Sequence, residues 1–342
     1  MCAGNFCSWC IQRSHDSKNV LPTVEFLHFK VYIIQNHKTV NHKLVEKKMR
    51  DYLNEMKSLP KNNEFFIGFD SDGCVFDSME VKHKECFCPA FIKHYNMQSA
   101  SKYAREIWDF VNLYSKTRGC NRFWAIYHSM KFIAQRPEIL ARGCKPVDTT
   151  ELEKWMANES KLGNPALEAY LEKVDCAELR QALAWSKEVN ARVADMVHGV
   201  PPLPGVKEVL ASASKKADLI VVSQTPLEAL EREWAENGMI QYVNLICGQE
   251  HGTKAEHIKY STEGKYAADC VLMVGDAPGD YKAAAKNNAL FFPIIPGREE
   301  ASWAELLNNG LNKFFNKEFA GAYQQQLLDE FDASLPENPN WQ

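Results

Sequence analysis

Three aspartates follow one short apolar run, and their spacing points to chemistry. Asp70, Asp72 and Asp77 lie within GFDSDGCVFDS, directly after FFIGF (65–69), a run typical of a buried strand. Carboxylates this close repel one another unless a positive charge intervenes. At a strand end, one such acid could be a nucleophile and another a proton donor, or both could bind a metal cation. The alternative is that they only cap a loop.

Strands and helices alternate through the second half of the chain. Apolar, β-branched runs predict further strands over 217–223, 242–248, 270–275 and 289–295. Predicted helices lie between or beside them, over 206–216, 227–238, 254–264 and 279–289. This alternation predicts an α/β fold with a Rossmann-like, doubly wound parallel sheet and helices on both faces.

Polar residues follow the later strands as well. Ser223 and Gln224 come after the second strand, Lys254 after the third, and Asp276 and Asp280 after the fourth. Ligands of open parallel sheets bind at the carboxyl ends of the strands, so these residues are expected to meet. Carboxylates, a hydroxyl and an amine together form a site for Mg²⁺ and an anion. The hydroxyl could instead come from Thr225, but its position in the strand favours Ser223.

A long helical insertion separates the first strand from the second. Residues 79–203 read as an all-helical cap, which ends at the proline-rich stretch VPPLPG. Its predicted helices include 101–116, 121–135, 149–160 and 177–197. The core is then formed by 61–78 and 204–342, with amphipathic helical segments over 302–331 at its end.

Residues 1–60 form an extension to which no role can be assigned. A strand is predicted over 23–35 and a charged amphipathic helix over 41–59. Cys7 and Cys10 form a single CxxC pair, and no second pair follows to complete a tetrahedral metal site.

The segments DSDGCVFDS, VVSQT, Lys254 and GDAPGD, in this order and spacing, resemble the four motifs of the haloacid dehalogenase superfamily. That superfamily is dominated by Mg²⁺-dependent phosphatases. The helical insertion after the first motif, and the segment PLPGVKEVL that follows it, resemble the subclass of phosphoglycolate phosphatases and β-phosphoglucomutases. The likeness covers about 64–296 in organisation and is specific only at the motifs.

The resemblance implies a role for each motif residue. Asp70 is the nucleophile that forms an aspartyl-phosphate, and Asp72 is the general acid and base. Ser223, Gln224 and Lys254 bind the substrate phosphate. Mg²⁺ is held by Asp70, Asp72 through its backbone carbonyl, Asp276 and Asp280. Asp280 could instead cap the helix that follows it, and a cap of the helix beginning near Ser78 is the favoured role of Asp77.

The cap is expected to select the substrate. In SKTRGCNRFW (115–124), Arg118 and Arg122 could contact an anionic part of it. The simpler alternative is that Gly119 ends one helix, Asn121 caps the next and Arg118 complements the helix dipole. Four tryptophans on the cap helices are expected in the core rather than in a ligand site; they are residues 108, 124, 155 and 185.

Composition narrows the class of protein and its surroundings. A net charge of −4 does not indicate a nucleic-acid partner. No apolar run approaches the roughly 20 residues that span a bilayer, and no secretory signal is recognisable. Eleven scattered cysteines without a repeated spacing favour reduced thiols and a cytoplasmic location. A monomer or homodimer is expected.

The function predicted is that of a Mg²⁺-dependent phosphatase for a small phosphorylated metabolite. The alternatives are a phosphomutase, which would keep all four motifs, and a phosphonatase, for which Lys82 or Lys84 could form a Schiff base. A dehalogenase is disfavoured because dehalogenases of this family lack the second acid at the position of Asp72. A non-catalytic binding protein is disfavoured because no motif residue is lost.

Overall fold

The computed structural model describes residues 50–341, in which five parallel strands form one sheet in the order β3-β2-β1-β4-β5. The strands are β1 (Phe65–Phe69), β2 (Ala217–Val222), β3 (Leu245–Cys247), β4 (Val271–Gly275) and β5 (Leu290–Pro293). The predicted α/β sheet is therefore confirmed. Strand β1 lies at its centre between β2 and β4, and all five of its residues are buried, as expected for a sheet covered on both faces.

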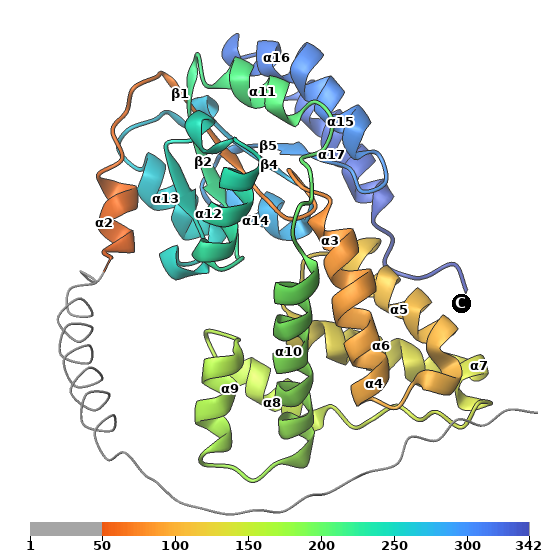
Figure 1. Ribbon diagram of the computed structural model, residues 1–342. Helices are drawn as coiled ribbons and strands as arrows, with labels where there is room; N and C mark the ends of the chain where they lie inside the picture. The colour runs from red at the N-terminus through yellow and green to blue at the C-terminus, as the bar shows by residue number, and fades with distance from the viewer. Residues whose placement is uncertain (1–49, 342) are drawn as a thin grey trace, which may run out of the picture. The chain divides into compact units, whose positions relative to one another are not determined.

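Helices cover both faces of this sheet (Figure 1). One face packs Phe65, Ile67 and Phe69 against α11 (Val206–Ala213), α12 (Leu227–Glu236), α15 (Glu299–Glu305) and α16 (Leu311–Phe315). The other face packs Phe66 against α2 (Tyr52–Lys57), α13 (Lys254–Thr262), α14 (Pro278–Lys286) and α17 (Ala322–Ser334). The C-terminal helices are therefore part of the core.

The extension predicted over 1–60 lies mostly outside the described residues, including its strand, its CxxC pair and the first half of its helix. Helix α2 is the part that is described. Met56 is fully buried, and Leu59 packs in the same hydrophobic cluster as Phe66 of β1. The last residues of the segment therefore belong structurally to the α/β core.

The insertion folds as helices around a core of its own. Its helices are α3 (Ser78–Val81), α4 (Cys88–His94), α5 (Ser101–Leu113), α6 (Arg122–Gln135), α7 (Pro137–Leu140), α8 (Thr150–Asn158), α9 (Asn164–Leu171) and α10 (Ala177–Met196). Trp108, Trp155 and Trp185 are buried within it, as predicted, and Trp124 packs at its margin.

A π-helical turn interrupts the first helix of the cap. Residues Lys82–Phe87 form this turn between α3 and α4. Pro89 follows in the first turn of α4 and has no N–H to donate to the carbonyl four residues earlier, so the regular α-helical ladder cannot continue there. The wider turn places Lys82 where the cap meets the core, and π-turns of this kind are common at functional sites.

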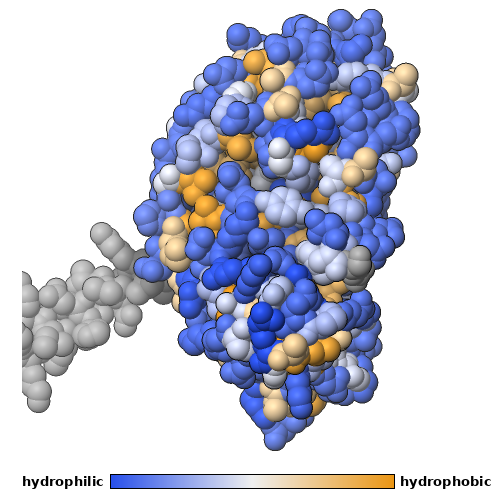
Figure 2. Space-filling view, turned by 90° about the vertical axis from the view of Figure 1, so that its right-hand side faces the viewer, coloured by the Kyte–Doolittle hydropathy of each residue, from blue (hydrophilic) through white to orange (hydrophobic). Residues whose placement is uncertain are grey.

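Figure 2 shows one face that is mostly hydrophilic, with hydrophobic residues in small separate groups. Among residues 50–341, no helix combines the length and the apolar character that crossing a bilayer requires.

Candidate active site

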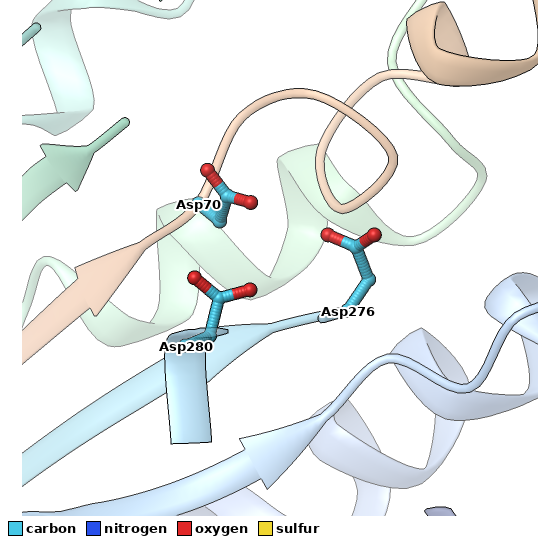
Figure 3. A group of neighbouring side chains, drawn as sticks. All are labelled: Asp70, Asp276 and Asp280. Atoms are coloured by element: carbon cyan, nitrogen blue, oxygen red, sulfur yellow. The ribbon is translucent and has the colours of Figure 1, made fainter. Parts of the chain in front are cut away.

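Three buried carboxylates meet at the carboxyl ends of the central strands. One oxygen from each of Asp70, Asp276 and Asp280 lies within 4.8 Å of the others. Figure 3 shows Asp70 just beyond β1, Asp276 just beyond β4 and Asp280 at the start of α14, with the carboxylates turned toward a common space. Asp70 is 4% exposed and the other two are 0% exposed, so the charges are held almost entirely away from water.

The sheet and one helix cap position these acids. The N–H of Asp70 donates to the carbonyl of Val274, 2.9 Å away, which fixes the end of β1 against β4. Oδ2 of Asp280 accepts from the N–H of Ala277 at 3.0 Å and so caps α14. A side chain at Gly275 would place its Cβ 2.5 Å from Asp280, so only glycine permits this approach. Asp280 therefore caps α14, as one of its two considered roles requires, and it also lies in the acid cluster, while its role as a metal ligand stays a prediction.

Lys254 neutralises part of the cluster from the opposite side. It is the first residue of α13, where Thr253 and Glu256 form a reciprocal capping box. Its Nζ lies 2.8 Å from Oδ2 of Asp70 and 2.6 Å from Oδ1 of Asp280. Burial alone would lower the pKa of Lys254, but the two carboxylates raise it above its ordinary value, so the amine stays charged.

Even with this cation, the cluster carries excess negative charge. Burial, opposed by Lys254, raises the pKa of Asp70 well above its usual range, and burial raises that of Asp276 in the same way. Oδ1 of Asp276 is buried and has no hydrogen-bond partner within residues 50–341. Hard oxygen donors with an unpartnered carboxylate oxygen fit a divalent cation such as Mg²⁺.

Asp72 has a different environment from Asp70, although only one residue separates them. Its Oδ1 accepts from Ser78 Oγ and Lys82 Nζ, each at 2.5 Å, and its Oδ2 accepts from Thr225 Oγ1 at 2.7 Å. Burial alone would raise the pKa of Asp72, but Lys82 and the two hydroxyls lower it to about 2. Its carboxylate is thus directed away from the cluster and toward the cap.

The phosphate-binding candidates lie on the loop after β2. Ser223 is 2% exposed, and its Oγ accepts from the N–H of Thr225 at 3.2 Å. The amide of Gln224 donates to the carbonyl of Gly252 at 2.9 Å, so it ties this loop to the one before α13. Thr225, the alternative to Ser223, uses its hydroxyl on Asp72.

Asp77 stands apart from the site, as its spacing suggested. It occupies the cap position of α3, but its side chain makes no capping hydrogen bond, and Ser78 uses its hydroxyl on Asp72. Asp77 therefore lies at the predicted cap position, but the capping hydrogen bond expected from its side chain does not form.

The two cap arginines both have partners within the protein. Nε and Nη2 of Arg118 lie 2.8 and 2.6 Å from Oδ2 of Asp276, and Nη1 donates to the carbonyl of Leu113 at 2.7 Å. Arg122 donates to Oγ of Ser186 at 3.0 Å and to Oδ1 of Asn190 at 2.6 Å, within the cap. Substrate contact by either arginine stays a prediction.

Two contacts of the site could not be derived from the motifs, namely Lys82 with Asp72 and Arg118 with Asp276. Both join the cap to the core. The one available signal was for Arg118, which lies beside a break between two predicted helices. Asn121, in contrast, caps α6 as predicted, since its side chain accepts from the N–H of Phe123 at 3.0 Å.

The sheet order and the acids at its strand ends define an α/β protein with a buried acid cluster at the carboxyl edge of its sheet, where ligands of open parallel sheets bind. The sequence model of the haloacid dehalogenase-like hydrolases matches residues 137–293. These are 157 of the 342 residues, so the chain is similar to haloacid dehalogenase-like hydrolases over a little under half of its length. The matched region begins inside the cap and reaches β5, so it includes Lys254 and Asp276 but not Asp70.

Solved structures of related proteins show low sequence identity. A putative phosphoglycolate phosphatase from Lactobacillus delbrueckii is 14% identical, with 67% of this chain and 85% of that chain covered and a TM-score of 0.40. A putative haloacid dehalogenase-type hydrolase from Bacillus subtilis, solved with magnesium, is 12% identical, with 72% and 100% covered and a TM-score of 0.38. The comparison with curated proteins gives no match.

Proposed function

We propose that this chain is a Mg²⁺-dependent phosphatase that hydrolyses a small phosphorylated metabolite through an aspartyl-phosphate. The observation that carries the proposal is the buried cluster of Asp70, Asp276 and Asp280 around Lys254, with Asp72 held separately beside it. A nucleophile and a proton donor on one loop, next to a cation site, are the groups that phosphoryl transfer needs.

Asp70 and Asp276 are the residues best placed to hold Mg²⁺. Asp280 lies in the same cluster, but its two oxygens already bind Lys254 and the N–H of Ala277. Its role is therefore to contribute negative charge close to the ion. When bound, the cation offsets the repulsion between the carboxylates and a substrate phosphate.

The chain's own residues then divide the reaction into two steps. An oxygen of Asp70 attacks the phosphorus, and the bond between phosphorus and the ester oxygen breaks as Asp72, once it is protonated and released from Lys82, gives that proton to the leaving alkoxide. In the second step Asp72 takes a proton from water, which attacks the aspartyl-phosphate and releases phosphate. Lys254 and Ser223 orient the phosphoryl oxygens by charge and by a donated hydrogen bond.

A cytoplasmic location is part of the proposal, because scattered cysteines without a repeated spacing favour reduced thiols. None of the cysteines within residues 50–341 forms a disulfide there. The partner proposed is the small-molecule substrate alone, with no nucleic acid and no membrane, for a chain that is a monomer or a homodimer.

Three aspartates of one short segment, Asp70, Asp72 and Asp77, make a matched test possible. Release of inorganic phosphate is measured on a panel of metabolite phosphate esters, with Mg²⁺ and with a chelator, for the wild type and for Asp70→Asn, Asp72→Asn and Asp77→Asn. Asp70→Asn should abolish turnover, and Asp72→Asn should lower it by roughly 10²- to 10⁴-fold. Asp77→Asn should keep wild-type activity, because Asp77 makes no bond to the site.

The products separate this function from the alternatives. A phosphomutase would yield an isomeric phosphate ester, and a phosphonatase would release phosphate from a phosphonate but not from an ester. Absence of Mg²⁺-dependent phosphate release from every ester of the panel, in a folded wild-type protein, would overturn the proposal.

A further inference from the structure

In the segment between α5 and α6, one arginine of the cap extends its side chain to the acid cluster of the core. The side chain of Arg118 is 3% exposed and that of Asp276 is 0% exposed. Residue 118 lies in a tight turn, in which its N–H donates to the carbonyl of Ser115 at 2.9 Å and Gly119 adopts a φ of +72°. The turn in the cap therefore fixes the backbone of Arg118, while nitrogens of its guanidinium contact Asp276 of the core.

The guanidinium binds one carboxylate oxygen of Asp276 and does not contact the other. Nε and Nη2 both contact Oδ2, and Nε also donates to the backbone carbonyl of Asp276 at 3.1 Å. Oδ1 remains buried without a hydrogen-bond partner among the described residues, on the carboxylate that shares a cluster with Asp70 and Asp280.

The loop of the first motif keeps this arrangement in place. A Cβ on Gly73 would lie 2.7 Å from Oδ2 of Asp276 and 2.8 Å from Nη2 of Arg118, so the loop packs directly over the ion pair. Gly73 has a φ of +78°, which also favours glycine. With Oδ2 held on several sides, the carboxylate has one orientation, and Oδ1 is the atom it offers to a cation.

We propose that Arg118 is a positioning residue of the metal site, which orients Asp276 so that Oδ1 coordinates the divalent cation. The proposal rests on the proposed Mg²⁺-dependent function. In this role Arg118 acts through Asp276 rather than through the substrate, because its nitrogens bind Asp276 and Leu113 and almost none of its surface is exposed. Residues that hold a metal ligand in its orientation are typically worth about 10- to 100-fold in metal affinity.

Lysine cannot replace this arginine. Three guanidinium nitrogens reach two groups that lie in different directions, the carboxylate of Asp276 and the carbonyl of Leu113. A single ammonium is a point charge without the planar fork, so it would balance the charge without fixing the orientation. Arg118→Lys therefore separates orientation from charge.

The test measures metal binding directly. The full chain is titrated with Mn²⁺ by electron paramagnetic resonance and with Mg²⁺ by calorimetry, as the wild type, Arg118→Met, Arg118→Lys and Arg136→Met. Arg136 is the matched control, because its side chain is 6% exposed and ion-paired to Glu106 within the cap, with no contact to the acid cluster. Both Arg118 variants should bind the metal about 10- to 100-fold more weakly, and Arg136→Met should bind like the wild type.

Two results would overturn the inference. One is metal affinity in Arg118→Lys equal to or tighter than that of the wild type, which would make Arg118 a mere counter-charge or a competitor of the metal. The other is an equal loss in Arg136→Met, which would make the effect one of cap stability. A wild type that binds neither cation and releases no phosphate would instead refute the proposed function. If the wild type binds metal and turns over substrate, and both Arg118 variants bind metal with the wild-type affinity, only the inference about Arg118 is refuted.

Discussion

Replacing Lys254 by methionine should destabilise the core in a way that a divalent cation reverses. Lys254 is the shared partner of Asp70 and Asp280, at 2.8 and 2.6 Å. At an effective dielectric constant near 20, unit charges 2.8 Å apart attract by about 6 kcal/mol, and much of this is offset by the cost of burying them. Methionine keeps the length and the packing of the side chain but leaves both carboxylates without their cation.

The expected cost follows from burial. Removing one partner of a buried ion pair typically costs about 3–5 kcal/mol, and the 18% exposure of the Lys254 side chain places this case near the lower figure. Saturating Mg²⁺, at about 100 times its Kd, contributes about 2.7 kcal/mol to the stability of a protein that binds it only when folded. Because the variant has fewer positive charges around its acids, it should gain at least as much from Mg²⁺ as the wild type does.

The assay is urea unfolding followed by circular dichroism, in a chelator and in excess Mg²⁺. Lys317→Met is the control, because Lys317 pairs with Glu64 at 3.1 Å on the surface, where both side chains are largely exposed, and its unfolding should match the wild type. If Lys254→Met unfolds no more easily than Lys317→Met in the chelator, Lys254 does not neutralise the buried acids as the distances indicate.

Two further variants examine the neighbouring groups. Lys82→Met should lower kcat by roughly 10²-fold and leave Mg²⁺ affinity unchanged, because Lys82 orients Asp72 and does not contact the cluster; an equal loss of metal affinity, measured by calorimetry, would contradict this. His257 is fully buried, and burial lowers its pKa to about 3, so unfolding takes up a proton below the ordinary pKa near 6.5. Its contribution to stability is full above pH 6.5 and declines toward pH 3. His257→Leu should therefore lose less unfolding free energy than the wild type between pH 7 and pH 4, and equal losses in urea titrations would exclude His257 as the cause.

The sheet could be predicted from the sequence because each strand is buried on both faces. Residues 65–69 and 270–275 read as continuous apolar runs, and the structure places strands there with the same or nearly the same bounds. The edge strand β3 is shorter than the predicted 242–248, since it pairs with β2 alone and residues Ile240–Tyr242 form a 3₁₀ turn instead. Strand ends, in turn, determine which side chains meet, so the acid cluster followed from the alternation of strands and helices.

The contacts across the boundary between cap and core could not be predicted in the same way. Arg118 and Asp276 are 158 residues apart, and their contact depends on how the cap docks, which no local periodicity encodes. The sequence offered two roles for Arg118, contact with an anionic part of the substrate or a charge that complements the helix dipole, and neither predicts its pairing with Asp276. Lys82 presents the same difficulty, because its place beside Asp72 depends on the π-helical turn that precedes Pro89.

The charges of the site link the cap to the chemistry of the core. The three clustered acids, Asp70, Asp276 and Asp280, face two cations, Lys254 and Arg118, so one negative charge is left to repel a phosphate dianion. A divalent cation reverses the sign of that sum, which favours its binding before the phosphate. One of the two protein cations comes from the core and the other from the cap. A cap taken from a relative without an arginine in this turn would therefore change the charge and the geometry at Asp276 as well as the choice of substrate.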